Sequence, residues 1–356
     1  MGICMSNEFP TIAERQRISM TITFLRFPLT LAIVMYHCYC VQTPNNQLLY
    51  AATIYPFGLM IGETGVPAFF FISGFLFFFS QRKFNQKLRT RVNTLIVPYL
   101  IWNAVVLLGY IVLMLFGHPL SIADKYIADF QFIDYVRAFI DRGQWDNGNG
   151  QPLLCPYWYV RNLIVLSLAA PLIGVVMKGR KGLVILCALL IWWLSLPYNG
   201  MVAQSLLFFC MGSFFSVNET SPLVLIKRTT GKVISTLWCL AVVLDWLSHF
   251  CFPIWGGLYV HRLVLILNVF MLFFFGSLIS MKCKMPSILI KSSFWIYTIH
   301  YPLTLLIRSV HPQSGYWEQF AFYWVSVVIV TTLCLVFYWL GHQLSPKVMN
   351  ILTGNR

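Results

Sequence analysis

Long runs of hydrophobic residues, separated by short polar segments, repeat along the whole chain. Most runs extend over about 17 to 25 residues, the length that an α-helix needs to cross the hydrocarbon core of a bilayer. The pattern therefore predicts an all-α, polytopic integral membrane bundle of about ten transmembrane helices. The expected spans are Ile18–Cys40, Phe57–Ser80, Leu95–Phe116, Tyr157–Met177, Leu183–Leu196, Met201–Val217, Val233–Phe252, Leu258–Ile279, Ile288–Val310 and Phe320–Leu344.

Composition and charge narrow the class of protein further. Hydrophobic residues make up 58% of the chain and charged residues only 10%, whereas a soluble domain has about a quarter of its residues charged. The net charge of +14 would suggest nucleic-acid binding in a soluble protein. Here the Lys and Arg residues concentrate in short loops between the spans, where they set the orientation in the membrane. We therefore expect a lipid bilayer around the protein and no nucleic acid as a partner.

Alternate loops carry most of the basic residues. Threading the chain back and forth places 18 of the 25 Lys and Arg residues on one side, which the positive-inside rule assigns to the cytosol. Both termini are then cytosolic: residues 1–17 form an N-terminal segment, residues 18–344 the membrane domain and residues 345–356 a tail. The longest exoplasmic loop, residues 117–156, contains an apolar stretch, Tyr126–Ile140, that can form a short helix. Either a contact with carbohydrate or ordinary solvation fits this loop.

The first predicted span carries two ionisable residues, Arg26 and His37. Ionisable groups cost free energy in hydrocarbon and rarely face lipid. Eleven helical residues bring the two side chains to within about 20° of one direction and about 16 Å apart along the helix axis. We therefore expect both side chains to point into one cavity at different depths. Each alone can also be structural, with Arg26 snorkelling to the cytosolic surface and His37 bonded to a neighbouring helix.

Polar and small residues mark the second span. Glu63 lies near its exoplasmic end, and a carboxylate beside His37 would fix the tautomer of the imidazole. Solvation of Glu63 in the loop is the alternative. Ser73 and Gly74 are small enough to permit close approach of another helix.

Further basic residues lie near the two membrane surfaces. Lys87 and Arg91 stand four residues apart on one helical face, which suits a phosphate-rich ligand or anionic lipid, and a role in setting orientation explains them equally. Arg161 opens the fourth span next to aromatic residues, either as a site residue or as an interfacial anchor. Three ionisable residues of later spans can join a cavity or simply bond a neighbouring helix: His261, Arg262 and His300.

The ten cysteines are scattered along the chain. They show neither the paired spacing of a zinc site nor that of a secreted disulfide framework. We expect them to pack as small apolar residues, and we expect no metal.

Five segments together resemble one family of membrane enzymes. They are Arg26 and His37 with ten residues between them, the block GVPAFFFISGFLFF, the basic stretch leading into VPYLIW, the segment WYVRNLIVLSLAAPLI, and SFWIYTIHYPL. They occur in the family's order and extend over about Ile18 to Leu344. On these segments the chain resembles the acyltransferase type 3 family of bacterial membrane-bound acyltransferases.

The resemblance implies transfer of an acyl group, usually acetyl, from cytosolic acyl-CoA (acetyl-CoA) to a hydroxyl of a glycan or glycolipid. It implies location in the bacterial cytoplasmic (inner) membrane. It also implies that Arg26 and His37 are catalytic and that Lys87 and Arg91 bind the donor, although the family often has two arginines there. Where relatives frequently show Arg-Asp, this chain has Arg161 followed by Asn, so a role that needs a carboxylate does not carry over.

The chemistry of these residues agrees with that activity. A neutral imidazole within hydrogen-bond reach of a sugar hydroxyl can take its proton as the oxygen attacks the thioester carbonyl, so we expect His37 to be the general base. Arg26, nearer the cytosol, can bind a donor phosphate or stabilise charge on the thioester oxygen. The roughly 16 Å between them is comparable to the reach of a pantetheine arm. The candidate supporting residues of the cavity are Glu63, Ser73, Arg161 and His300.

A transporter or flippase of a small acyl compound or glycolipid is the main alternative. Alternating access uses a site in mid-membrane, often with broken helices and an internal repeat. Pro28 and Gly74 can supply breaks, but no repeat is visible in the sequence. A passive structural membrane subunit is a third alternative, and it predicts that replacing Arg26 or His37 has no effect on function.

Overall fold

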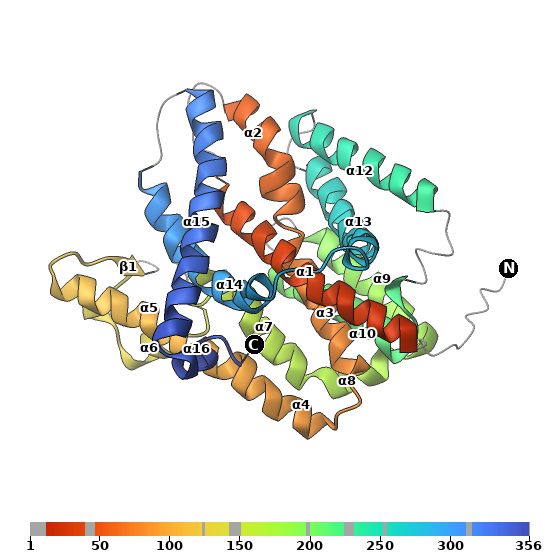
Figure 1. Cartoon of the computed structure of the whole chain (residues 1–356), viewed down its shortest axis with the longest axis horizontal. Coiled ribbons are helices and arrows are strands. Elements are labelled where there is room, and N and C mark those ends of the chain that lie inside the picture. The colour runs from red at the N-terminus through yellow and green to blue at the C-terminus, as the bar shows by residue number, and fades with distance from the viewer. Residues whose placement is uncertain are drawn as a thin grey trace.

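The computed structural model describes residues 12–39, 47–122, 125–141, 151–196, 200–223, 231–251, 255–310 and 315–355. Most of these residues are helical, and α1 crosses the middle of the bundle with α3, α13, α14 and α15 against it (Figure 1). The helices are α1 (Ile12–Cys38), α2 (Gln47–Tyr55), α3 (Gly65–Phe79), α4 (Phe84–Arg91), α5 (Val97–Leu115), α6 (Phe132–Ala138), α7 (Trp158–Leu168), α8 (Ala170–Val176), α9 (Gly179–Ser195), α10 (Met201–Val217), α12 (Gly231–Cys251), α13 (Trp255–Ser280), α14 (Ser287–Arg308), α15 (Tyr316–Leu344) and α16 (Pro346–Leu352). Two π-helical turns, Pro56–Ile61 and Val92–Ile96, join α2 to α3 and α4 to α5.

Each of the ten predicted hydrophobic runs contains a helix. Six helical segments are long and apolar enough to cross a membrane, and the bent pair Cys155–Leu168 and Ala170–Val176 makes a seventh if it counts as one span. The other three predicted spans are α9 and α10, with 17 residues each, and α14, which carries Lys291 and His300. The predicted count of ten is therefore higher than the six or seven that length and composition support. The polytopic helical bundle itself is confirmed.

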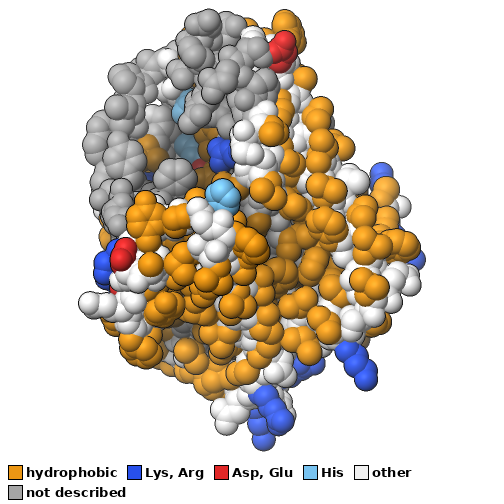
Figure 2. All heavy atoms as spheres, turned by 90° about the vertical axis from the view of Figure 1, so that its left-hand side faces the viewer, with side chains coloured by type: hydrophobic (Ala, Val, Ile, Leu, Met, Phe, Trp, Pro, Cys, Tyr) orange, Lys and Arg blue, Asp and Glu red, His pale blue; other side chains and the backbone are white. Residues whose placement is uncertain are grey.

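Hydrophobic side chains cover the outside of the bundle as well as its interior. Figure 2 shows a face whose middle is an almost continuous hydrophobic surface, with Lys and Arg side chains gathered at its lower edge. Leu108 on α5 is 58% exposed and Val328 on α15 is 62% exposed. Such a surface is unfavourable in water but favourable in contact with lipid tails. The helices satisfy their own backbone hydrogen bonds, so no backbone polar group is left unpaired in the lipid. The chain is therefore a multi-pass integral membrane protein.

The loops with most of the basic residues meet at one end of the bundle, which we call the basic end. Arg17 on α1 donates Nη2 to Ser277 Oγ at the end of α13, at 3.0 Å. The guanidinium of Arg15 lies 5.2 Å from the ring centre of Phe79, the last residue of α3. Helix α16 also packs against the start of α5. The first and last described residues thus lie at the same end, as the positive-inside rule predicts, and the opposite end is called the outer end.

Close approach of α3 and α10 fixes the centre of the bundle. A Cβ atom on Gly212 would lie 2.0 Å from the carbonyl oxygen of Phe71, and one on Gly74 would lie 2.1 Å from that of Phe209. The two backbones therefore touch where no side chain fits, as small residues permit between membrane helices. The prediction that Gly74 allows close helix approach is confirmed.

The long outer loop is partly folded. Strands β1 (Ser121–Ile122) and β2 (Lys125–Tyr126) pair antiparallel, and α6 forms inside the stretch predicted to be helical. Lys125 Nζ lies 3.1 Å from Asp134 Oδ2, and the amide of Leu153 donates to the carbonyl oxygen of Ala138 at 2.9 Å. The Tyr99 hydroxyl donates to the carbonyl oxygen of Phe139, and the amide of Leu154 donates to Asn103 Oδ1 at 3.1 Å, so the loop is attached to α5. Residues 142–150 of this loop and the N-terminal residues 1–11 lie outside the described residues, and α1 begins at Ile12 rather than Ile18.

The helix crossing predicts a sharp difference between two glycines. Gly212→Val should destabilise the fold by about 3 kcal/mol, because the valine side chain collides with the α3 backbone. Gly109→Val is the matched control, since a Cβ there meets no atom within 4 Å. Size-exclusion chromatography in mild detergent should show loss of the monodisperse peak for the first variant only. An equally monodisperse Gly212→Val protein would contradict this packing.

Candidate active site

Two cavities lie end to end along the bundle, and the same four helices line both. The inner cavity, nearer the basic end, has a volume of about 290 Å³, and the outer cavity about 510 Å³. Along α1 and α14 the residues that line the inner cavity come before those that line the outer one, and along α3 and α7 the order is reversed. The inner cavity includes Arg26, Ser73, Arg91, Tyr159, Lys291 and Tyr297, and the outer cavity includes His37, Glu63, Trp158, Gln204, His261 and Arg308.

One stripe of α1 faces both cavities. Ile22, Arg26 and Thr30 line the inner cavity, and Ile33 and His37 line the outer one. These positions follow the spacing of three and four residues that keeps side chains on one helical face. The prediction that Arg26 and His37 share a face is confirmed.

Aromatic rings separate the two cavities. The ring centre of Tyr159 lies 5.8 Å from that of Tyr297 and 4.7 Å from that of Phe70. Tyr297 also donates its hydroxyl to the carbonyl oxygen of Pro156. We call Phe69, Phe70, Tyr159 and Tyr297 the aromatic partition. The expectation that Arg26 and His37 share one cavity is therefore wrong, because this partition lies between them.

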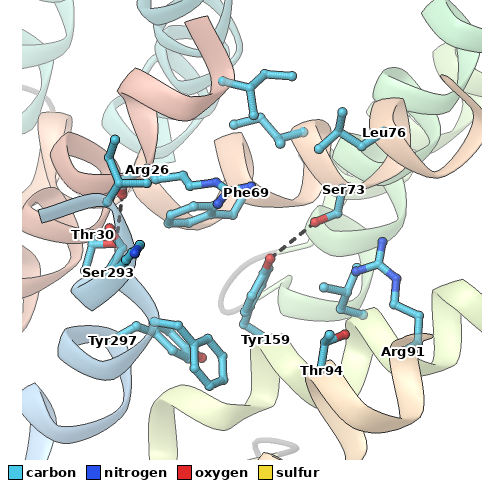
Figure 3. Close-up of a pocket in the computed structure, with 16 residues that line it drawn as sticks. Arg26, Thr30, Phe69, Ser73, Leu76, Arg91, Thr94, Tyr159, Ser293 and Tyr297 are labelled. Atoms are coloured by element: carbon cyan, nitrogen blue, oxygen red, sulfur yellow. Dashed lines mark hydrogen bonds between the residues drawn. The ribbon is translucent and has the colours of Figure 1, made fainter. Parts of the chain in front are cut away.

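Three cations surround the inner cavity: Arg26 from α1, Arg91 from the end of α4 and Lys291 from α14. Arg26 and Arg91 extend into it from different sides (Figure 3). No acid is found among the described residues that line this cavity. Within the described part of the chain, the guanidinium of Arg26 also has no hydrogen-bond or ion-pair partner. Three like charges with no acid beside them repel one another, so the inner cavity suits an anionic ligand.

Of the predicted basic pair, only Arg91 lines the inner cavity. Lys87 Nζ lies 5.1 Å from the ring centre of Phe77, and the Arg91 guanidinium lies 5.9 Å from the same ring. The two basic residues do share a helical face, with Lys87 outside the cavity. Ser73 is placed in the cavity, with its Oγ 3.4 Å from the hydroxyl of Tyr159 (Figure 3). Lys291 was not among the predicted site residues, although a lysine inside a predicted span is itself a signal of a site.

His37 lies half-buried in the outer cavity against α14. Its ring centre is 5.1 Å from that of His300 and 5.1 Å from that of Tyr301. His300 is fully buried, and its Nδ1 lies 3.0 Å from the carbonyl oxygen of Ile296. Because a carbonyl can only accept, Nδ1 carries the hydrogen, and Nε2 of the neutral ring is an acceptor. This Nε2 has no hydrogen-bond partner among the described residues, so an acceptor nitrogen is available close to His37.

Glu63 bonds His261 rather than the predicted partner, His37. Its Oε2 lies 3.1 Å from His261 Nε2, and His261 Nδ1 lies 2.8 Å from Asp245 Oδ2. The hydroxyl of Tyr55 donates to Asp245 Oδ1 at 3.2 Å. Both ring nitrogens therefore face carboxylate oxygens, and both can donate only if the imidazole is protonated. Sequence reasoning missed Asp245, although an acid within a predicted span is a signal of a functional or paired group.

Two other arginines form hydrogen bonds within the protein itself, Arg161 mainly with the Asn162 side chain and Arg262 with backbone carbonyls. Arg161 donates Nη2 to Asn162 Oδ1 at 2.8 Å and Nη1 to the carbonyl oxygen of Ile140. It therefore attaches the outer loop to α7 and lines neither of the two cavities. Arg262 lines the outer cavity, but its Nη1 donates to carbonyl oxygens at the end of α9, including that of Leu196 at 2.7 Å. Neutralising the free carbonyls of a helix C-terminus in this way is a common role for arginine.

The described residues show no metal centre. They contain no group of three or more His, Cys, Asp or Glu residues able to hold a metal ion. Of the cysteines whose side chains are described, seven are free thiols, and four of these are buried.

Comparison with known proteins identifies the family. The model of the type 3 acyltransferase family, described as an acyltransferase domain, matches residues 21–339. This chain belongs to the acyltransferase type 3 family. The resemblance carried by the five sequence segments is thereby confirmed, and the protein is a membrane acyltransferase.

One characterised bacterial protein is similar to this chain over most of its length. The succinoglycan biosynthesis protein ExoH of Rhizobium meliloti (strain 1021) is 23% identical over 318 residues, which cover 84% of this chain and 82% of that protein. The similarity therefore extends over most of both chains. No solved structure gives a significant match.

The paired charges of the outer cavity predict a stability effect. Asp245→Ala should lower the free energy of unfolding by about 3 kcal/mol, because it leaves a buried imidazole and the Tyr55 hydroxyl without their partner. Asp129→Ala removes an exposed carboxylate of the outer loop and should leave stability unchanged. Unfolding of both variants in detergent measures the difference. Equal stability of the two would contradict the network.

Proposed function

We propose that this acyltransferase transfers an acyl group, most simply acetyl, from acyl-CoA to a hydroxyl of a cell-surface or envelope glycan or glycolipid. The donor would occupy the inner cavity and the acceptor the outer cavity. The observation that carries the proposal is the inner cavity with three cations and no acid among its described lining residues. The similarity to a protein named for succinoglycan biosynthesis supports a polysaccharide as acceptor. The membrane would be the bacterial inner membrane, with the basic end in the cytosol.

The size of the inner cavity limits how much of the donor enters it. Its volume of about 290 Å³ is at the lower end of the range for small-molecule sites, about 300–1,000 Å³. A pantetheine arm with a short acyl group fits such a volume better than a whole coenzyme does. The phosphates would then bind Arg91 and Lys291 at the mouth, with Lys87 adding positive charge nearby.

In the proposed acyl transfer, His37 acts as the general base. As the acceptor oxygen attacks the thioester carbonyl carbon, the imidazole takes the hydroxyl proton. The carbon–sulfur bond then breaks, and the leaving thiolate recovers that proton from the imidazolium. Arg26 and His37 are about 16 Å apart along α1, so the arm reaches His37 only if the rings of Tyr159 and Tyr297 turn aside. Arg26 lies where the arm enters and would hold it or its thioester oxygen.

His300 is suited to position His37. If one N–H of His37 donates to His300 Nε2, the other nitrogen of His37 is left unprotonated and can accept the hydroxyl proton. The ring centres are 5.1 Å apart, so a small rotation forms this hydrogen bond. It would also satisfy the buried Nε2, which has no partner among the described residues. His300 is therefore a positioning residue in this proposal.

Replacing the general base is the direct test. His37→Gln should reduce the O-acyl groups on surface polysaccharide at least about 100-fold, because glutamine cannot take the proton. NMR of polysaccharide from cells carrying each variant measures them, and isothermal titration of the purified protein with coenzyme A should show donor binding unchanged. His118→Gln, an exposed histidine of the outer loop, is the matched control. Wild-type acylation in His37→Gln cells would contradict the proposal, and lost solute uptake together with unchanged acylation would indicate a transporter.

A further inference from the structure

A chain of hydrogen bonds from three helices ends on Glu63. It runs from Tyr55 on α2 to Asp245 on α12, then to His261 on α13 and finally to Glu63, just before α3. Asp245 is completely buried and uses both of its carboxylate oxygens, and His261 uses both of its ring nitrogens. The Glu63 side chain is 35% exposed and lines the outer cavity. The buried members of the network all have hydrogen-bond partners, and the Glu63 carboxylate is its most exposed member and faces the cavity.

The free oxygen of Glu63 is held in a fixed direction. Its Oε2 is held by His261, and the other oxygen has no partner among the described residues. A carboxylate oriented by a buried charged partner has lost most of its rotational freedom before a ligand arrives. Because Glu63 contacts His261 and not His37, its role is distinct from orienting the proposed base.

The charges around this cavity select the kind of group that Glu63 binds. Arg262 and Arg308 also line the cavity, so a cationic ligand is disfavoured by these two residues. An anionic group is disfavoured by the Glu63 carboxylate itself. A neutral hydroxyl can donate to the carboxylate without either penalty. The half-buried Trp158 and the 39% exposed Tyr36 add aromatic surface for the apolar face of a sugar ring.

We propose that Glu63 is the acceptor-binding residue of the outer cavity and accepts a hydrogen bond from a sugar hydroxyl other than the one that becomes acylated. Asp245, His261 and Tyr55 act through it as positioning residues. This inference rests on the proposed function, because it requires a glycan acceptor in the outer cavity. It makes Glu63 a determinant of which hydroxyl arrangement the enzyme accepts, since a site built to bond a hydroxyl rejects ligands that lack it.

The test is a kinetic comparison on the purified, detergent-solubilised full chain. The donor is radiolabelled acetyl-CoA, and the acceptor probe is surface polysaccharide isolated from cells that lack this protein. Glu63→Gln keeps the size of the side chain but removes its charge, and it should raise the KM for polysaccharide about tenfold or more. The KM for acetyl-CoA and the kcat should stay within about twofold. Asp129→Asn, an exposed carboxylate that lines neither cavity, is the matched control.

A second variant tests the positioning network without touching the cavity. Tyr55→Phe removes only the hydroxyl that donates to Asp245, and it should raise the same KM by a smaller factor, about two- to fivefold. A purely structural role of the network would lower the yield of folded protein without this selective change in KM.

The possible outcomes separate the two claims. If the wild-type protein transfers acetyl to the polysaccharide and Glu63→Gln leaves the polysaccharide KM unchanged, the inference about Glu63 is wrong and the proposed function stands. A loss confined to kcat, or an equal loss of acetyl-CoA binding, also overturns it. If the wild-type protein transfers no acetyl from acetyl-CoA, the proposed function fails and the inference fails with it.

Discussion

The free-energy cost of placing charged side chains inside a membrane-spanning bundle determines where they lie in this structure and what they bond. Charged groups at this depth need a partner, a water-filled cavity or a ligand. At the outer cavity the protein supplies the partners itself, since Asp245, His261 and Glu63 bond one another. At the inner cavity Arg26 has no such partner among the described residues, and the neighbouring cations add to the same sign of charge. The difference gives each end of the bundle its own ligand chemistry.

The same helices line the inner and the outer cavity, which lie one after the other along the bundle. A single stripe of α1 carries Arg26 and His37, and the tight crossing with α10 fixes α3, which also lines both cavities. Between them, the rings of the aromatic partition close the path. A closed partition would keep water of the outer side away from a reactive thioester until the acceptor is in place, which limits wasteful hydrolysis. The same packing that separates the cavities therefore serves the proposed reaction.

The sequence predicts those features that depend on spacing along one helix. The polytopic bundle, the shared face of Arg26 and His37 and the close packing at Gly74 all follow from hydrophobic runs and the 3.6-residue period. Features that join distant segments were missed. Asp245 and Glu63 meet through His261 although they lie far apart in the chain, and no local pattern shows which helices are neighbours. The expectation of one cavity failed for the same reason, because Tyr159 and Tyr297 reach the partition from different helices.

We propose that acyl-CoA enters from the basic end and points its acyl group along the α1 stripe toward His37. The most direct measurement is a cryo-EM structure of the full chain in lipid nanodiscs with a thioether analogue of acetyl-CoA. We expect phosphate density beside Arg91 and Lys291 and the acyl end between Arg26 and His37, with the ring of Tyr297 displaced. Coenzyme density in the outer cavity, or on α4 outside an unoccupied inner cavity, would contradict it.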